Sequence, residues 1–292
     1  MLRSGFGRKD GSLSANTLGK LSITDRSGGF LNLIKSIAGS DLAFCLDAYS
    51  IKDVAVGGKI TNWYDSLGVL GTSFTQGTEV NKPAFGLSRG KPIVLFSGTN
   101  RLTTASTLST LNGIRDYTII IMHDYADAAG ATLIMLEYSP NYSATNAFIY
   151  TVGSAPRAFG AAQYNTSVGY CANGPDSTYF DRTKPVVVGT VMDRNDPGAG
   201  FNKSATPYTN GRLVPIGEQT VGVPPTANSM RDPLASNLNI SIGAREISSS
   251  LPYQGGIGSI IIVKRKLTSS EMSRISTAMM DRYSVSESEV YL

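Results

Sequence analysis

The sequence contains one histidine, His123, in the stretch Met122-His123-Asp124. A hydrolase of the Ser-His-Asp type would need this residue as its general base. His123 directly follows an apolar, β-branched run, so a structural histidine at a strand end is favoured over a catalytic base. We expect Asp124 and Asp127 in the turn that follows.

A metal site has two weak candidates. Asp193, Asn195 and Asp196 form an oxygen-rich loop after an apolar run. Calcium requires about six to eight oxygen ligands, and Arg194 lies inside this loop, so an ordinary Asx turn is favoured and calcium remains the alternative. The two cysteines belong to no CxxC or His/Cys pair, which argues against zinc. No cofactor is expected.

Tyrosine-rich segments are the candidates for binding. Aromatic rings beside polar groups form platforms for sugars, and they also form subunit interfaces. Three segments rich in Tyr, Asn and Ser have this composition, and ordinary surface loops have it as well. The tyrosines concerned are Tyr138, Tyr142, Tyr164, Tyr179 and Tyr208.

The pattern of apolar residues predicts many strands. Short apolar or β-branched runs recur between turn residues, as in an antiparallel sandwich or jelly roll. We expect the run at 132–138 to be the hairpin partner of the run at 117–122, because Ala-Ala-Gly lies just before it. The predicted strands cover residues 43–46, 60–64, 93–96, 117–122, 132–138, 147–152, 167–171, 185–192, 239–243 and 257–264.

One segment near the C-terminus has a helical period. Residues 268–283 place Met272, Ile275, Met279 and Tyr283 on one face, and the polar start of the segment resembles a helix cap. The fold class predicted is therefore all-β: an antiparallel two-sheet jelly-roll sandwich with one C-terminal helix.

Charge is distributed unevenly along the chain. The net charge is +4, and residues 1–40 hold six basic residues against two acidic ones, so the remainder is neutral. We expect residues 1–40 to be an extended attachment arm, residues 41–283 the jelly-roll domain and residues 284–292 an acidic tail. A solubilising tail is the alternative to attachment. The arm residues proposed are Arg3, Arg8, Lys9, Lys20 and Arg26.

Three stretches in order resemble the concanavalin-A-like lectin/glucanase superfamily, in its laminin-G-like branch. The pattern begins with "LDA" at residues 46–48, and a W-x-D-x-S-G strand and turn follows at residues 63–68. Leu67 stands where the family pattern has serine before the final glycine, which is a slight departure. A Y-x-N-G-x-L hairpin follows, whose Asn-Gly pair suits a type I′ turn, and an I-G-x-R to L-t-x-x-E stretch closes the pattern. The matching residues are 46–48, 57–68, 82–83, 93–102, 208–213, 240–245, 253–262 and 267–271.

The resemblance implies a fold and leaves the function open, because the superfamily includes lectins, hydrolases, adhesion modules and viral appendage proteins. It assigns Trp63 to the core. Its glucanases carry an E-x-D-x-x-E strand with two catalytic carboxylates, and none of the seven glutamates here has an aspartate two positions later. The sequence therefore predicts a protein that is not an enzyme.

The first functional hypothesis is a bacteriophage virion protein, a tail fibre, receptor-binding tip or capsid decoration. Its arm would bind other virion proteins, and its copies would form a homo-oligomer. The second is a carbohydrate-binding lectin module, and the third is a divergent polysaccharide hydrolase or lyase. Nucleic-acid binding and membrane insertion are not expected. The start of the sequence lacks the apolar stretch of a secretory signal, so we expect synthesis in a host cytoplasm and a final location in the virion.

Overall fold

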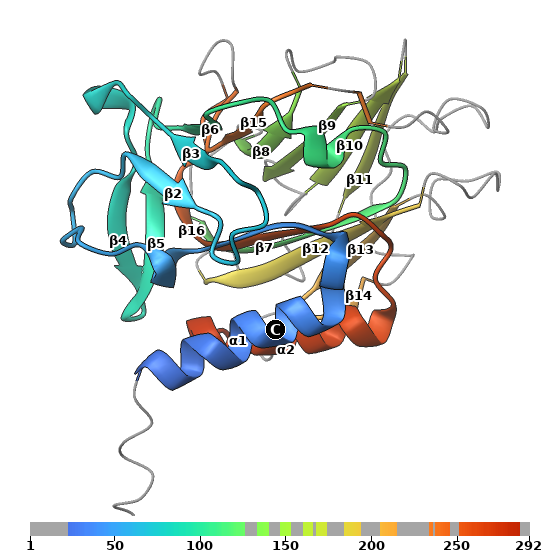
Figure 1. Ribbon diagram of the computed structural model, residues 1–292, viewed down its shortest axis with the longest axis horizontal. Helices are drawn as coiled ribbons and strands as arrows, with labels where there is room; N and C mark the ends of the chain where they lie inside the picture. The colour runs from blue at the N-terminus through green and yellow to red at the C-terminus, as the bar shows by residue number, and fades with distance from the viewer. Residues whose placement is uncertain are drawn as a thin grey trace, which may run out of the picture.

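The computed structural model describes most of the chain between residues 23 and 286. The described ranges are 23–125, 133–139, 147–152, 160–165, 168–173, 184–193, 205–214, 234–235, 237–245 and 251–286. Two antiparallel sheets pack face to face, and two helices lie against the outer face of one of them (Figure 1). The predicted jelly-roll sandwich is therefore confirmed.

The first sheet contains the longest buried strands. Its order is β14 (Arg212–Leu213), β13 (Ala205–Thr209), β12 (Val186–Met192), β7 (Tyr117–Tyr125), β16 (Gly255–Val263), β5 (Lys91–Phe96) and β4 (Ala84–Ser88), and β1 (Leu42–Asp47) also pairs with β16. Strands β1, β12 and β16 are buried along their whole length. Burial on both faces explains why these strands have continuous apolar runs in the sequence instead of alternation.

The second sheet combines longer and very short strands. Its order is β11 (Val168–Asn173), β10 (Gly160–Asn165), β9 (Ala147–Val152), β8 (Leu133–Tyr138), β15 (Ile240–Ile242), β6 (Leu102–Thr104), β3 (Ser73–Thr75) and β2 (Asn62–Tyr64). Each predicted run overlaps a strand. The short strands β3, β4, β6 and β10 were not predicted, because three to six residues of partly polar sequence give too weak a pattern.

The predicted hairpin between residues 117–122 and 132–138 is wrong. Strand β7 pairs with β12 and β16 in the first sheet, whereas β8 pairs with β9 and β15 in the second. Both segments are apolar, and hydrophobic pattern alone does not show which strands are partners. The chain therefore changes sheets between β7 and β8.

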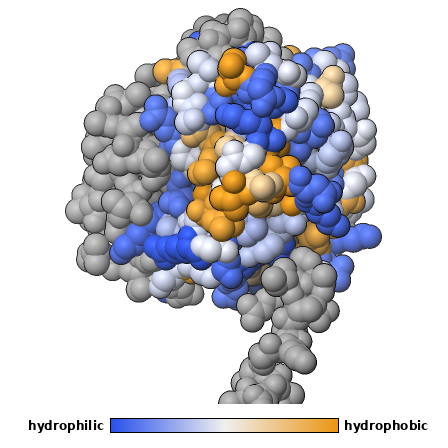
Figure 2. Space-filling model, turned by 90° about the vertical axis from the view of Figure 1, so that its left-hand side faces the viewer, coloured by the Kyte–Doolittle hydropathy of each residue, from blue (hydrophilic) through white to orange (hydrophobic). Residues whose placement is uncertain are grey.

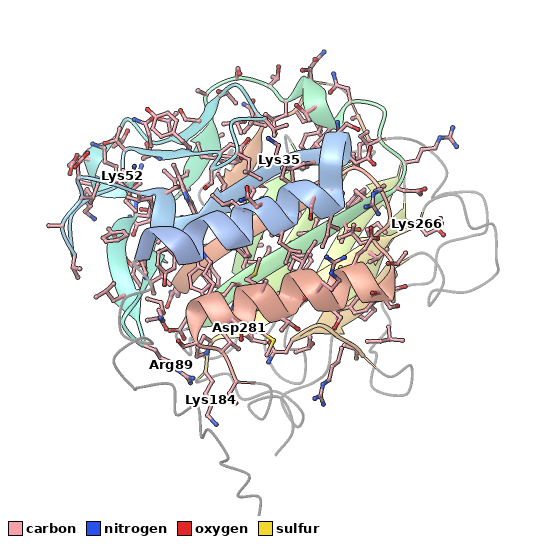
Figure 3. The ribbon with its side chains drawn as sticks, turned by 60° about the horizontal axis from the view of Figure 1, so that its bottom comes forward. Lys35, Lys52, Arg89, Lys184, Lys266 and Asp281 are labelled. Carbon is pink, nitrogen blue, oxygen red and sulfur yellow. The ribbon has the colours of Figure 1, made fainter. Side chains whose placement is uncertain are left out.

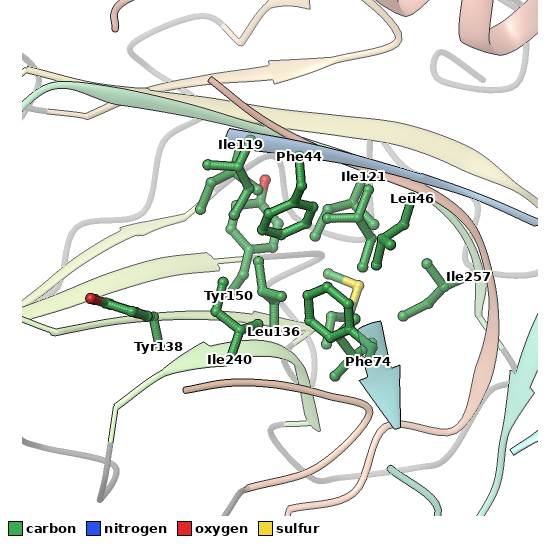
Figure 4. Close-up of a cluster of buried hydrophobic side chains, with 14 of the residues drawn as sticks. Phe44, Leu46, Phe74, Ile119, Ile121, Leu136, Tyr138, Tyr150, Ile240 and Ile257 are labelled. Atoms are coloured by element: carbon green, nitrogen blue, oxygen red, sulfur yellow. The ribbon is translucent and has the colours of Figure 1, made fainter. Parts of the chain in front are cut away.

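The core between the sheets is apolar and rich in aromatic rings. Phe44 of β1 packs against Phe74 of β3 with ring centroids 5.3 Å apart, among isoleucines from both sheets (Figure 4). Trp63 is fully buried in this core, as the resemblance implied. The hairpin from β13 to β14 turns at Asn210 and Gly211, which both have positive φ, as a type I′ turn requires.

A second apolar cluster joins the first sheet to its two helices, α1 (Ile23–Ala38) and α2 (Ser269–Tyr283), which lie side by side across it (Figure 3). The predicted C-terminal helix is confirmed. Thr268 is its N-cap and forms a capping box with Glu271. Met272, Ile275 and Met279 are buried against the sheet.

The N-terminal helix corrects the predicted arm. Phe30, Ile34 and Ile37 lie at positions i, i+4 and i+7 of α1 and are buried against the first sheet and α2. Residues 23–40 are therefore part of the domain instead of an extended arm, and the boundary predicted at residue 40 separates α1 from the sheet on which it packs. Residues 1–22 lie outside the described part of the chain.

The start of the predicted acidic tail is also packed. Ser284 ends α2 with positive φ, and the Val285 N–H donates to Met280 O at 2.9 Å. Val285 is buried in the helix cluster. The domain therefore continues to at least residue 285, and residues 287–292 lie outside the described ranges.

Charged clusters fix both ends of the helix pair. At one end, Arg282 of α2 donates through Nη2 to Asp47 Oδ2 at 2.6 Å, and Tyr283 donates through its hydroxyl to Asp47 Oδ1 at 2.7 Å. The Arg282 guanidinium carbon lies 3.9 Å from the Tyr49 ring centroid and 5.1 Å from that of Phe30 in α1. Because Asp47 ends β1, this cluster connects the sheet to both helices.

At the other end, Arg265 makes the connection. Its Nη2 donates to Ile37 O, near the end of α1, and to Glu271 Oε1 in α2, both at 2.7 Å. The hydrogen bond from Arg265 lowers the pKa of Glu271 to about 2. The helix layer is thus held to the sheet at two separate points.

Because α1 is part of the core, Ile34→Ala should lower the free energy of unfolding by about 2–5 kcal/mol, through loss of buried contacts and creation of a cavity. Urea denaturation measures this change. The adjacent exposed residue provides the control, and Lys35→Ala should change the stability by less than about 0.5 kcal/mol. Equal stabilities of Ile34→Ala and the parent chain would show that α1 does not pack on the sheet.

Candidate functional site

The outer faces of the two sheets differ. The helices cover the first sheet (Figure 1). The second sheet presents polar side chains on β2, β3 and β6. Trp63, Phe74 and Leu102 point into the core, so their neighbours along each strand point outward. The outward residues are Asn62, Tyr64, Ser73, Thr75 and Thr103.

These five residues lie next to one another by strand register. Tyr64 is opposite Ser73, Asn62 is opposite Thr75, and Thr75 is opposite Thr103. Within the described residues, the side chains of Asn62, Ser73, Thr75 and Thr103 make no hydrogen bond. We call this group the β2–β6 face. It offers one amide and three hydroxyls, all partly accessible to a ligand.

Tyr64 supplies an aromatic surface at the edge of this face. The residue is 62% exposed, although Trp63 beside it is fully buried. A shallow hollow of about 360 Å³ adjoins it, lined by Tyr64, Asp65, Gly68, Gly71, Thr72 and Ser73. An exposed tyrosine ring presents a large apolar surface without a packing role in the core, which is a usual feature of binding surfaces.

Asp65 holds the loop beside Tyr64 in place. Its carboxylate accepts four backbone N–H groups, from Cys45 at 3.0 Å, Leu67 at 3.1 Å, Val69 at 2.5 Å and Leu70 at 2.8 Å. Hydrogen bonds to a charged acceptor are stronger than neutral ones. The hollow therefore has a wall fixed by its own backbone, which reduces the entropy lost when a ligand binds.

A charged cluster continues the polar row toward the centre of the sheet. Thr103 is opposite Ser241 of β15, which is opposite Glu137 of β8. Glu137 is buried, with Oε1 4.0 Å from Arg245 Nε, and Arg101 Nη1 donates to Arg245 O at 2.9 Å. This cluster anchors the segment after β15 and lies next to the accessible part of the face.

Two of the tyrosines predicted to be in binding loops are core residues instead. Tyr138 is fully buried in β8 and donates to Ala235 O at 2.7 Å, and burial raises its pKa to about 12. Tyr208 of β13 is buried against α2, with its hydroxyl 3.0 Å from Ser269 Oγ. Both predictions are wrong because Tyr138 points into the core between the sheets and Tyr208 points into the apolar cluster beneath α2.

For the other three predicted tyrosines, the position of the side chain is not described. Tyr164 belongs to β10, where only the backbone is described, and Tyr142 and Tyr179 lie outside the described residues. Sequence reasoning also missed Tyr64. The alternation Asn62-Trp63-Tyr64 contained the signal, because a core assignment for Trp63 places the next residue on the outer face.

Only one of the three calcium candidates lies within the described residues. Asp193 accepts from Lys266 Nζ at 2.5 Å, while Asn195 and Asp196 lie outside the described ranges. Within the part of the chain that is described, no group of three or more His, Cys, Asp or Glu side chains could hold a metal ion.

Of the arm residues, Arg26 belongs to α1, and Arg3, Arg8, Lys9 and Lys20 lie outside the described part.

Cys45 is a free and fully buried thiol on the helix side of β1, and burial raises its pKa. Only the backbone of Cys171 is described, in β11. None of the helices in the described ranges is long and apolar enough to span a membrane.

His123 is a buried strand residue, as predicted. It lies in β7, and its Nδ1 is 3.3 Å from the Tyr253 hydroxyl. Burial lowers its pKa to about 3, so the imidazole is neutral at pH 7. Asp124 also lies in β7 and accepts a hydrogen bond from Ser88 Oγ, so the prediction that it lies in a turn is wrong, and Asp127 is outside the described residues.

No protein-family model matches the sequence, and no curated protein matches it. Solved structures do match the fold. Domain 4 of AbnA, an extracellular GH43 arabinanase from Geobacillus stearothermophilus in complex with arabinotriose, is 13% identical, with 81% of this chain and 98% of that chain covered and a TM-score of 0.52. The binding domain of Paraclostridial Mosquitocidal Protein 1 is 11% identical, with 82% and 53% covered and a TM-score of 0.56.

A third structure, HCR/D with a W1238A substitution, is 11% identical, with 84% and 52% covered and a TM-score of 0.55. This chain thus spans about half the length of the last two structures. At these identities the likeness shows the fold alone, which is the jelly-roll sandwich expected from the sequence.

His123 should make stability depend on pH. Its folded pKa of about 3 lies below its ordinary value of 6.5, so the unfolded chain binds the proton more readily. Stability is complete above pH 6.5 and should fall as the pH drops from 6.5 toward 3. His123 is the sole histidine. The urea concentration at the midpoint of unfolding should therefore decrease from pH 7.5 to pH 5 in the parent chain and stay nearly constant in His123→Gln. Equal slopes for the two proteins would contradict a buried neutral imidazole.

Proposed function

We propose that this chain is a non-catalytic, carbohydrate-binding jelly-roll protein whose ligand lies on the β2–β6 face. The observation that carries the proposal is the exposed Tyr64 ring beside an amide and three hydroxyls that make no hydrogen bonds within the described residues. A sugar presents C–H groups on its ring face and hydroxyls at its edge. The aromatic ring packs against the first, and Asn62, Ser73, Thr75 and Thr103 exchange hydrogen bonds with the second.

The setting of this face also supports the proposal. Its strands rest on the core through Trp63 and Phe74, so the ligand-facing side chains are held on rigid elements. A similar fold binds sugar in at least one solved case, the arabinanase domain in complex with arabinotriose. For this chain, we propose an oligosaccharide of a cell surface as the ligand.

We further propose that the protein is a peripheral component of a bacteriophage particle, a tail fibre, receptor-binding tip or capsid decoration. The sequence resemblance includes such appendage proteins, and the excess of basic residues lies before β1 while the rest of the chain is neutral. Residues 1–22 would bind an acidic surface of another virion protein, and copies of the chain would form a homo-oligomer. The jelly roll would then face outward to the host.

Tyr64→Ala should abolish most of the glycan binding. Stacking of a sugar on an aromatic ring contributes about 1–2 kcal/mol, so the affinity should fall by about tenfold or more. A glycan array identifies the ligand, and calorimetry measures it. Tyr64→Phe should retain the binding, and Val80→Ala, at another exposed position, is the matched control. If Tyr64→Ala binds as well as the control, the ligand does not lie on this face.

Removal of residues 1–22 should leave a folded domain that no longer assembles. The full chain and the truncated chain are compared by light scattering, and circular dichroism verifies the fold. The truncation stops before α1 because this helix is part of the core. If the two proteins contain the same number of subunits, residues 1–22 have no assembly role. That result would leave the glycan proposal unaffected.

A further inference from the structure

A pocket lies on the other side of the molecule, between the two helices and the turn that connects β4 to β5. Its volume is about 560 Å³, within the usual range for small-molecule sites. Figure 2 shows apolar side chains gathered in the middle of one face, within a hydrophilic rim. The pocket is lined mainly by apolar groups, namely Phe30, Tyr49, Leu87, Pro92 and Ala278, and by Gly29, Gly90, Lys91, Asp281 and Arg282.

Arg282 does not act as the polar anchor of this pocket. Asp47 neutralises its charge through two hydrogen bonds, and the rings of Phe30 and Tyr49 lie close to its guanidinium group. Its side chain is 4% exposed. Arg282 therefore shapes one wall, and a ligand must find its charged partner elsewhere.

Two glycines in α1 give a reason to expect an occupant. Glycine is among the least favourable residues in a helix interior, so Gly28 and Gly29 reduce the stability of α1. A Cβ atom added at either position would have no atom within 4 Å. Packing within the chain therefore does not require glycine here, and the absence of a side chain at Gly29 keeps this wall of the pocket open.

The charged groups of the lining define the chemistry of the ligand. The side chains of Lys91 and Asp281 make no hydrogen bond or ion pair with the residues that are described. Lys91 is partly buried, whereas Asp281 is exposed to water and lies at the rim near Arg89 (Figure 3). Solvent screens the exposed carboxylate more strongly, so the field inside the pocket is dominated by the ammonium group.

We propose that this pocket binds a small amphipathic acid. Its apolar body packs against Phe30, Leu87 and Pro92, and its carboxylate pairs with Lys91 Nζ at the turn between β4 and β5. The site is independent of the β2–β6 face, which lies on the second sheet. It is a second binding function, which does not depend on the carbohydrate proposal.

Calorimetry of the full chain with octanoate tests the proposal, and octanol is the uncharged ligand of the same length. Octanoate should bind, and octanol should bind about tenfold more weakly, because it lacks the charge. In Lys91→Met, the affinity for octanoate should fall about tenfold while that for octanol is unchanged. Lys52→Met removes an exposed lysine outside the pocket and should bind both ligands like the parent chain.

A second variant separates binding from folding. Gly29→Leu adds a side chain in open space on a helix, so the melting temperature should stay equal or rise, while both ligands should lose at least about tenfold in affinity. Tyr64→Ala should bind octanoate normally. The proposal is overturned if octanoate does not bind the parent chain at about 2 mM, if Lys91→Met binds it normally, or if a folded Gly29→Leu does.

Discussion

A single buried carboxylate connects the first strand, β1, to the last helix, α2. Asp47 lies at the end of β1 and receives hydrogen bonds from Arg282 and Tyr283, 235 and 236 residues later. A carboxylate without a partner in such a place would cost about 3–5 kcal/mol, so the fold is stable only when α2 closes over β1. Tyr49 and Phe30 then enclose the guanidinium group and bring α1 into the same cluster.

This constraint determines which surfaces remain for binding. With Arg265 holding the opposite end, α1 and α2 are fixed across the first sheet, and its outer face becomes a second core. The second sheet has no α-helix over it in the described residues, and its strands β2, β3 and β6 carry polar groups outward. One sheet thus provides the support, and the other provides an exposed surface with an aromatic ring at its edge.

The strands with continuous apolar runs, β1, β7, β12 and β16, could be predicted from the sequence because burial on both faces leaves an unambiguous composition. The helix α2 was predictable from its period and its cap. Strand pairing was not, since β7 and β8 have similar apolar content but belong to different sheets. The helix α1 was missed because Gly28 and Gly29 and the nearby basic residues indicate a flexible segment, whereas its stability comes from tertiary packing.

The candidate site was harder to predict than the fold. Composition singled out tyrosines, but exposure depends on the strand position of each ring and on what covers it. Tyr138 points into the core between the sheets, Tyr208 is covered by α2, and Tyr64 is exposed. The polar neighbours of Tyr64 come from three strands that are separate in the sequence, and only their register brings them together. A local motif cannot contain this information.

We expect carbohydrate to bind to the exposed face of the second sheet. Hydrogen–deuterium exchange, with and without the oligosaccharide that binds best on a glycan array, locates the ligand directly. A ligand on this face should slow exchange in β2, β3, β6 and the loop at residues 65–72, and exchange in α1 and α2 should not change. Protection confined to the helices and the turn between β4 and β5 would contradict it.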